Sequence, residues 1–433
     1  MMVIRKFRSA LGMAGSATAR DSLIFFIGNF ANTALSFIAV IIVSRHLGPS
    51  SFGILAVFNT FYVLIIALTD LGLNTTSIRL VSQYRKEDPK KAAITMNVIV
   101  RIEFFVGVLI LITGSLFARP IANLVGGQDY LTAVRAAFLA GAFASAAAFF
   151  GPFFVAYRQY VRNAVLNFAS FVLRTGAVLV MLAGAALSLN RVIAVYTLVP
   201  IIFFGVGLWF IPHDFFVKTK KTDRSSAYQD VIHYSKWIFL SLAASGAISR
   251  LDLLFLTRYH GAQQAGYYYA AQQLITIMPL IITALSTVLL QRISQLDSSQ
   301  FGAYLKRAFG GILVLGIFML PVLLLAPYLF QVVFGNNYAS SAGPFRLLFL
   351  AQLVLLLVIP LNVKLLRIGQ PAKITLATAV QFLVSISLYI ALIPSYGMTG
   401  AAGAILAGSV ASAIILFFFA MRPMRGKSQE LVV

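Results

Sequence analysis

The chain alternates between long apolar runs and short polar segments, and this alternation predicts its architecture. Each run reaches the roughly 20 apolar residues that a helix needs to cross the hydrocarbon core of a bilayer. The runs are residues 22–44, 52–80, 92–117, 131–156, 164–189, 192–211, 234–257, 266–290, 308–334, 344–365, 372–393 and 400–421. We therefore predict an all-α, polytopic membrane protein with about 12 transmembrane helices.

The composition agrees with a membrane protein. The chain is 60% hydrophobic and 11% charged, whereas a soluble domain averages about 25% charged residues. No water-soluble fold hides this much apolar surface. Cysteine is absent and histidine is scarce, with four residues, so disulfides and thiolate metal sites are excluded and no metal centre is expected.

The distribution of lysine and arginine predicts how the chain is oriented. The net charge is +22, and the basic residues gather in alternate loops, for example between Arg79 and Lys91 and between Lys218 and Lys236. The opposite loops carry only Arg45, Arg119, Arg135, Arg191, Arg258 and Arg346. Basic loops remain in the cytoplasm beside anionic lipid, so both termini are predicted to be cytoplasmic. The same argument explains the positive charge without any nucleic acid.

Loop lengths predict the domain organisation. Residues 1–20 are a cytoplasmic amphipathic segment, and residues 213–233 are a basic cytoplasmic linker in mid-chain. These segments and a cytoplasmic tail at 423–433 delimit two lobes, an N-lobe at 21–212 and a C-lobe at 234–422. The loops leave no room for an extramembrane catalytic domain.

A short motif occurs twice and indicates an internal duplication. Arg45, Gly48 and Gly53 recur with the same spacing as Arg258, Gly261 and Gly266, each time between two apolar runs. A second pair, Arg-Ala-Ala-Phe-Leu-Ala from 135 and Arg-Leu-Leu-Phe-Leu-Ala from 346, has nearly the same separation. Spans one to six therefore match spans seven to twelve, and the two six-helix lobes are parallel repeats of the kind found in transporters.

The motif and its continuation resemble a known family. The relevant residues are Asp70-Leu71-Gly72-Leu73-Asn74 with Arg79, and Gly266-Tyr267-Tyr268-Tyr269-Ala270-Ala271-Gln272. They are similar to those of polysaccharide-biosynthesis flippases, the Wzx-type O-antigen transporters of the multidrug/oligosaccharidyl-lipid/polysaccharide exporter superfamily. The resemblance implies a MATE-like V shape and a place in the bacterial inner membrane. It also implies that the protein moves a polyprenyl-diphosphate-linked oligosaccharide between leaflets by alternating access, beside a glycan polymerase or export machinery.

Ionisable residues within the spans are the candidate functional groups, because charge in hydrocarbon is costly. Arginine binds phosphate oxygens bidentately and stays charged, so arginines deep in the spans and at the inner mouth are candidate cavity residues. They are Arg79, Arg101, Arg174 and Arg250. The carboxylates Asp70, Glu103 and Asp252 are candidates for proton or sodium coupling, or for charge pairs.

Each of these charges also has a structural interpretation. Asp70 would cap a broken helix or pair with a neighbouring span, and Arg174 would pair with Asp70 or Glu103. Arg250 and Asp252 would form an intramembrane ion pair. The repeat aligns these two residues with the apolar Phe37 and Ala39, so the fold itself does not require charge there.

Neutral polar residues within the spans form a second group of candidates. Asn29, Asn32 and Gln272 have side chains that hydrogen-bond sugar hydroxyls, although hydrogen bonds between helices are an equal alternative. The tyrosines at 267–269 are interpreted as an aromatic belt at the interface, with sugar stacking as the alternative.

Several functional classes remain to be compared. No phosphate-binding Gly-x-x-x-x-Gly-Lys-Ser/Thr motif is present, so no cofactor is expected and energy comes from an ion gradient, the membrane potential or glycan consumption. A multidrug exporter would favour an acidic cavity for organic cations, and a glycan polymerase or ligase would need a large outer loop. A scaffold subunit would lack deep charges. The sequence thus favours a flippase that is not an enzyme.

Overall fold

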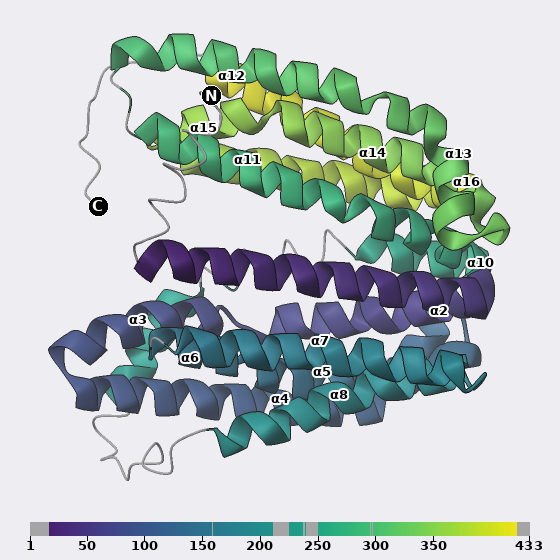
Figure 1. Ribbon diagram of the computed structural model, residues 1–433, viewed down its shortest axis with the longest axis horizontal. Helices are drawn as coiled ribbons and strands as arrows, with labels where there is room; N and C mark the ends of the chain where they lie inside the picture. The colour runs from purple at the N-terminus through teal and green to yellow at the C-terminus, as the bar shows by residue number, and fades with distance from the viewer. Residues whose placement is uncertain are drawn as a thin grey trace, which may run out of the picture. The chain divides into compact units, whose positions relative to one another are not determined.

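The computed structural model describes an entirely helical chain (Figure 1). It describes residues 17–157, 159–210, 225–236, 239, 250–294, 296 and 298–421, and for 17–34, 86, 160, 294, 298 and 299 it describes the main chain only. Throughout these ranges every element of regular structure is an α-helix or a 3₁₀-helix. Hydrocarbon has no partner for backbone N–H and C=O groups, and a helix satisfies them within the segment.

The described helices match the predicted spans. Nine helical stretches of the described chain are long and apolar enough to cross a membrane. Pro371–Met421 contains two predicted spans, 372–393 and 400–421. Leu35–Arg85 and Leu251–Ile293 each contain one complete predicted span and the end of the one before it. The prediction of an all-α polytopic membrane protein is confirmed.

The helices are divided by short breaks. Before the linker they are α2 (Ala17–Thr69), α3 (Leu73–Glu87), α4 (Pro89–Val125), α5 (Leu131–Ala148), α6 (Phe150–Ala156), α7 (Tyr160–Ala183) and α8 (Leu189–Trp209). After it they are α10 (Leu251–Ile275), α11 (Ile277–Ser294), α12 (Ser298–Met319), α13 (Pro321–Phe334), α14 (Ala342–Leu357), α15 (Ile359–Arg367) and α16 (Pro371–Met421). Of the predicted extramembrane segments, residues 1–16, 213–224 and 423–433 lie outside the described residues.

The described residues form two compact units. One unit contains the described residues up to Leu47 and those from Val57 to 239, and the other contains Gly48–Ala56 and the residues from Arg250 onward. In the first unit α5 packs against α4 and α8, and the three helices lie side by side (Figure 1). In the second unit α16 packs against α10 and α14. Two segments fall outside the lobe in which the sequence placed them. Gly48–Ala56 belong to the second unit, and the described residues 234–236 and 239 belong to the first.

The repeated motif has the same backbone geometry in both copies. Gly48 has φ 70° and ψ 172°, and Gly261 has φ 76° and ψ −176°. These dihedral angles are strained for any residue with a Cβ atom, so glycine is required at both positions. Each glycine interrupts a helix, and the chain continues as a second helix after it.

The second glycine of each motif allows two backbones to touch within the second unit. A Cβ atom on Gly53 would meet the carbonyl oxygen of Ala262, and one on Gly266 would meet the carbonyl oxygen of Pro49. Ala262 and Pro49 hold equivalent positions in the two copies, so the contact is reciprocal. Phe52 extends it, with its ring centroid 5.0 Å from that of Tyr269. The two copies of the motif therefore pack against each other as a symmetric helix crossing.

The other repeated segment also has matching structure. Gly127 and Gly335 have φ 121° and 95°, and each is followed by a 3₁₀-helix, η1 (Gln128–Tyr130) or η3 (Asn336–Ser341). Tyr130 and Tyr338 hold equivalent buried positions within these turns. The duplication seen in the sequence is thus accompanied by repeated local structure.

The glycine crossing gives a first prediction. Gly53→Ala or Gly266→Ala places a methyl group against a backbone carbonyl that has no side-chain freedom to move away. We expect either variant to lose about 1–3 kcal/mol of stability, as overpacking does, measured as a lowered thermal midpoint in detergent. Gly316→Ala is the matched control, because its Cβ meets nothing within 4 Å. Equal midpoints for all three variants would contradict the crossing.

Candidate functional site

The first unit contains a cavity of about 570 Å³. Helices α2, α5, α6, α7 and α8 and residue Ile78 of α3 contribute to its wall. Most of the lining is apolar or aromatic, and the polar side chains are Tyr62, Asn163, Asn167, Ser170, Arg174 and Tyr196. A mainly apolar pocket of this size with a few convergent polar groups is typical of a ligand site.

Helix α7 supplies most of the polar lining. Asn163, Asn167, Ser170 and Arg174 follow one another at intervals of four, three and four residues, and all four line the cavity. Side chains three and four positions apart lie on the same face of a helix. Val165 and Val172 lie on another face of the same helix and are 59% and 44% exposed. One face of α7 is therefore polar and lines the cavity, while another is apolar and exposed.

Arg174 carries the only formal charge among the described residues that line the cavity. Its Nη2 donates to Ser36 Oγ at 3.1 Å. Its guanidinium carbon lies 5.0 Å from the ring centroid of Phe171 and 5.1 Å from that of Tyr196. Within the described part of the chain no carboxylate forms an ion pair with it, including Asp70 and Glu103. The positive charge is therefore stabilised by the Ser36 hydroxyl and the rings of Phe171 and Tyr196. No counter-ion among the described residues neutralises it.

Asp70 lies at the break between α2 and α3. Its Oδ1 accepts a hydrogen bond from the backbone N–H of Asn74 at 3.0 Å, so it stabilises the start of α3. The break itself passes through Leu71 and Gly72, which have φ 47° and 74°. Glu103 lies on α4, is 8% exposed, and has Asp70 as its electrostatic neighbour. Neither carboxylate lines the cavity.

The other basic candidates of the first unit lie away from the cavity lining. Arg101 donates from Nε to Asn97 Oδ1 at 2.8 Å on its own helix. Arg79 donates from Nη1 to Tyr234 Oη at 2.6 Å and lies over that ring at 4.7 Å. The side chains of the remaining candidates, Asn29 and Asn32, lie outside the described residues, although both residues belong to α2.

A buried polar cluster in the second unit contains Asp252. This side chain is 1% exposed. Its Oδ2 accepts from Tyr268 Oη at 2.6 Å and from Gln272 Nε2 at 2.8 Å, and its Oδ1 accepts from the backbone N–H of Leu253 at 2.8 Å. The structure therefore brings together two residues that the sequence had singled out separately, Asp252 and Gln272.

Arg250 lies just before α10 and contributes differently. Within the described residues it forms no ion pair with Asp252, and its buried Nε has no hydrogen-bond partner. Two other buried atoms of the same region, Gln272 Oε1 and Tyr389 Oη, have no partner either. Tyr389 is 1% exposed and interacts electrostatically with Asp252. Asp252 thus accepts hydrogen bonds from neutral groups and interacts electrostatically with Arg250, and the cluster has hydrogen-bonding capacity left over.

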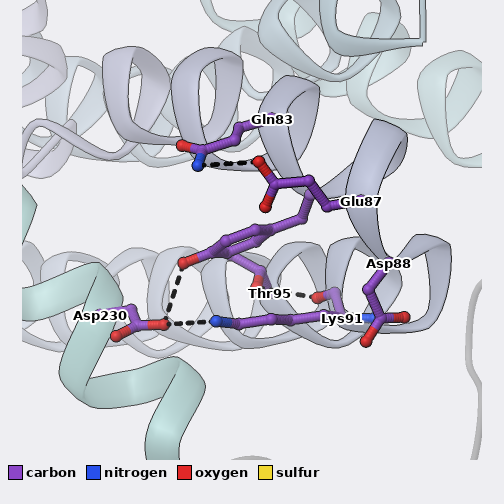
Figure 2. A network of polar contacts seen from close by, with 7 residues as sticks. Gln83, Glu87, Asp88, Lys91, Thr95 and Asp230 are labelled. Carbon is purple, nitrogen blue, oxygen red and sulfur yellow. Dashed lines mark hydrogen bonds and ion pairs between the residues drawn. The ribbon is translucent and has the colours of Figure 1, made fainter.

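A polar network fastens part of the predicted linker to the first unit. Figure 2 shows Asp230 reaching toward Lys91, and the ion pair measures 3.2 Å from Nζ to Oδ2. The same oxygen accepts from Tyr84 Oη at 3.0 Å, while Lys91 Nζ lies 4.1 Å from the Tyr84 ring centroid. Asp88 caps α4 by accepting from the backbone N–H groups of Lys90 and Lys91.

The linker residues of this network are helical. Residues 225–236 form a helical segment, on which Ala227, Val231 and Ser235 are buried at intervals of four residues. Ala227 and Val231 pack in a hydrophobic cluster with residues of α3, α4 and α6. This second half of the predicted linker is therefore a docked part of the first unit.

Sequence reasoning did not single out several residues of these sites. In the cavity they are Tyr62, Asn163, Asn167, Ser170 and Tyr196. Near Asp252 they are Tyr268, which donates a hydrogen bond to it, and Tyr389, which interacts with it electrostatically. The polar spacing along α7 was a readable signal for three of them. No spacing rule pairs Tyr389 with Asp252, since they lie far apart in the chain. Within the part of the chain that the structure describes, no group of three His, Cys, Asp or Glu side chains could hold a metal ion.

Comparison with known proteins agrees with this architecture. A family model described as polysaccharide biosynthesis protein matches residues 18–297. The chain is similar in fold to an inward-facing multidrug resistance MATE family transporter of the MOP superfamily, with TM-score 0.68, 16% identity, and coverage of 90% of this chain and 93% of that chain. It is also similar to the lipid II flippase MurJ in an inward closed conformation, with TM-score 0.73, 15% identity, and coverage of 92% and 88%.

A third similar structure is a MOP superfamily transporter from Pyrococcus furiosus Vc1 (DSM3638), for which a binding pocket of reverse polarity suggests a different function. The TM-score is 0.57 at 17% identity, covering 93% of this chain and 94% of that chain. No curated protein matches the chain. At these identities the similarity shows a shared fold and says nothing about the chemistry of the cavity.

The docked linker helix gives a second prediction. Asp230→Ala removes both the half-exposed ion pair with Lys91, which contributes at most about 1 kcal/mol, and the hydrogen bond from Tyr84, which contributes about as much. We expect amide hydrogen exchange across residues 225–236 to become several-fold faster in the full-length protein. Glu87→Ala is the control, because its described bond is an exposed one from Gln83. Unchanged exchange in Asp230→Ala would show that apolar packing alone holds the helix.

Proposed function

We propose that this chain, which belongs to the polysaccharide biosynthesis protein family, is a flippase for a polyprenyl-diphosphate-linked oligosaccharide. The membrane-transporter fold and the family are the premises of this proposal. The finer statement is that the lipid-linked glycan moves from the inner to the outer leaflet by alternating access, without a covalent step.

The observation that carries the proposal is Arg174, the one cation among the described residues that line the cavity, which has no ion-pair partner among them. A diphosphate-linked sugar cannot cross about 30 Å of hydrocarbon without replacement of its hydration shell. Arg174 offers a permanent positive charge whose planar fork matches phosphate oxygens. The surrounding amides and hydroxyls of Tyr62, Asn163, Asn167 and Ser170 replace water around the sugar.

The orientation proposed for the chain follows from its charges. Basic residues such as Arg79, Arg85 and Lys91 gather at one end of the first unit's helices, and the positive-inside rule assigns that end to the cytoplasm. With the family, this supports a location in the bacterial inner membrane with cytoplasmic termini. A glycan polymerase or the export machinery would receive the product on the other side.

Asp252 is the proposed coupling group. It is a buried carboxylate held by two neutral side-chain donors, so its charge is available to a proton or sodium ion. Gln272 Oε1 and Tyr389 Oη are oxygen atoms of the same cluster without a partner among the described residues. Oxygen atoms of this kind suit a hard cation as well as a proton. Binding or release of one positive charge there would couple an ion gradient to transport.

A multidrug exporter is the competing proposal, and the fold alone allows it. The aromatic lining of Tyr62, Phe171 and Tyr196 would suit flat organic molecules. However, exporters of organic cations need negative charge at the site, whereas the described lining contains Arg174 and no carboxylate. The charge of the cavity therefore favours an anionic substrate.

The first functional prediction concerns Arg174. Arg174→Ala should reduce flipping of a fluorescent polyprenyl-diphosphate oligosaccharide in proteoliposomes at least tenfold, because the phosphate loses its only charged contact. Arg174→Lys should retain part of the activity, since it keeps the charge but not the bidentate fork. Arg119→Ala is the matched control, as Arg119 is exposed on α4 and lies outside the cavity lining. Full activity in Arg174→Ala would refute the cavity assignment, and export of organic cations instead would support the competing proposal.

The second functional prediction concerns coupling. Asp252→Asn keeps the shape and part of the hydrogen bonding but removes the charge that a proton or sodium ion would neutralise. We expect the variant to fold and bind substrate normally, while stimulation of transport by an imposed proton or sodium gradient disappears. Asp129→Asn serves as the control, because Asp129 is an exposed residue of η1. Stimulation that persists in Asp252→Asn would place coupling elsewhere.

A further inference from the structure

We infer that the polar face of α7 determines which sugar the protein accepts, and that this sugar is uncharged. The inference rests on the proposed function and goes beyond it by naming the residues and the class of sugar. Asn163, Asn167 and Ser170 would contact the sugar next to the diphosphate, and Arg174 would hold the diphosphate itself.

The two asparagines are already linked by hydrogen bonds along α7. Asn167 Nδ2 donates to Asn163 Oδ1 at 2.8 Å and to the Asn163 backbone carbonyl at 3.0 Å. Ser170 Oγ donates to the Asn167 backbone carbonyl at 2.7 Å. These bonds orient the side chains in advance, so little order has to be created when a ligand binds.

Among the described residues, these hydrogen bonds leave one amide donor and one amide acceptor without a partner on adjacent turns of the helix. Asn163 Nδ2 and Asn167 Oδ1 have no partner among the residues that the structure describes, and both side chains line the cavity. An amide that donates beside an amide that accepts matches the hydroxyl and acetamido groups of a sugar, which do both. A purely apolar drug would cover these groups without pairing them, which costs free energy because they lose their hydration.

The charge of the residues that line the cavity favours neutral sugars over acidic ones. Its described residues supply one positive charge, Arg174, and a diphosphate already carries more negative charge than one arginine neutralises. A sugar carboxylate would therefore find no cationic partner in the lining, because Arg162 at the end of α7 lies outside it and donates to Gln159 Oε1. Hydroxyl and amide groups need no such partner.

The positions along α7 fix the order of the two subsites. Asn163 and Arg174 are 11 residues apart, about 16 Å along a helix axis. Asn163 lies near the end of α7 that carries Arg162, while Arg174 lies further into the apolar span. The Tyr196 ring faces the Arg174 guanidinium and so belongs to the deep end of the cavity. The diphosphate would thus bind deep in the cavity, with the sugar lying along α7 toward its basic end.

Binding of three lipids to the purified full-length protein tests this inference. The probes are a bare polyprenyl diphosphate, the same lipid bearing one N-acetylhexosamine, and the same lipid bearing one hexuronic acid. We expect the wild type to bind the N-acetylhexosamine lipid at least tenfold more tightly than either of the others. In Asn163→Ala/Asn167→Ala this preference should fall below twofold, while affinity for the bare lipid stays unchanged. Unchanged affinity for the bare lipid also shows that the variant is folded.

Two controls separate the possible outcomes. Val165→Ala/Val172→Ala alters the exposed apolar face of the same helix and should behave as the wild type. A tenfold preference that survives in the asparagine double variant would overturn the role of α7 and leave the proposed function standing. Equal binding of the hexuronic acid lipid by the wild type would overturn the uncharged sugar. If the wild type binds none of the three lipids, the proposed function itself fails.

Discussion

Hydrocarbon offers no hydrogen-bond partner to a backbone amide or to a charged side chain, and the rest of the structure depends on this constraint. It makes every described element a helix, since a helix satisfies its own backbone. Three of the long helices are interrupted at a glycine with positive φ, namely Gly48, Gly261 and Gly397. The same constraint governs the charges, because each buried charge has to be stabilised by groups that the protein itself provides.

Two charges within apolar helices, one in each unit, are stabilised in a similar way. Arg174 is held by Ser36 and two aromatic rings, and Asp252 is held by Tyr268, Gln272 and a backbone N–H group. Neither has an ion-pair partner among the described residues. An ion pair would stabilise each charge more fully, but it would also cancel it. Neutral partners stabilise the charge while leaving it available to a ligand, which is why both residues enter the proposed mechanism.

The two repeats share their backbone geometry but not the chemistry of their side chains. Gly48 and Gly261 have nearly identical dihedral angles, and Gly53 and Gly266 each face a carbonyl of the other copy. These contacts depend on small residues and backbone atoms, so both copies must keep them. The charged residues obey no such symmetry, since Asp252 aligns with the apolar Ala39. Residues that differ between the two repeats, such as Asp252, are therefore not required by the shared fold and are available for function.

The sequence by itself determined the all-helical membrane fold, the repeated turns and the charged residues that lie within apolar segments. These follow from local properties, namely the length of apolar runs and the conformational freedom of glycine. It also singled out Arg174 and Asp252, because charge in a long apolar run is visible without a structure. Only the tertiary structure decided what surrounds them. Helix packing places the polar face of α7 in one cavity with Tyr62 of α2 and Tyr196 of α8, and it brings Tyr389 of α16 close enough to interact electrostatically with Asp252 of α10. Which helix faces meet depends on the fit of side chains across many contacts, and no single segment encodes that fit.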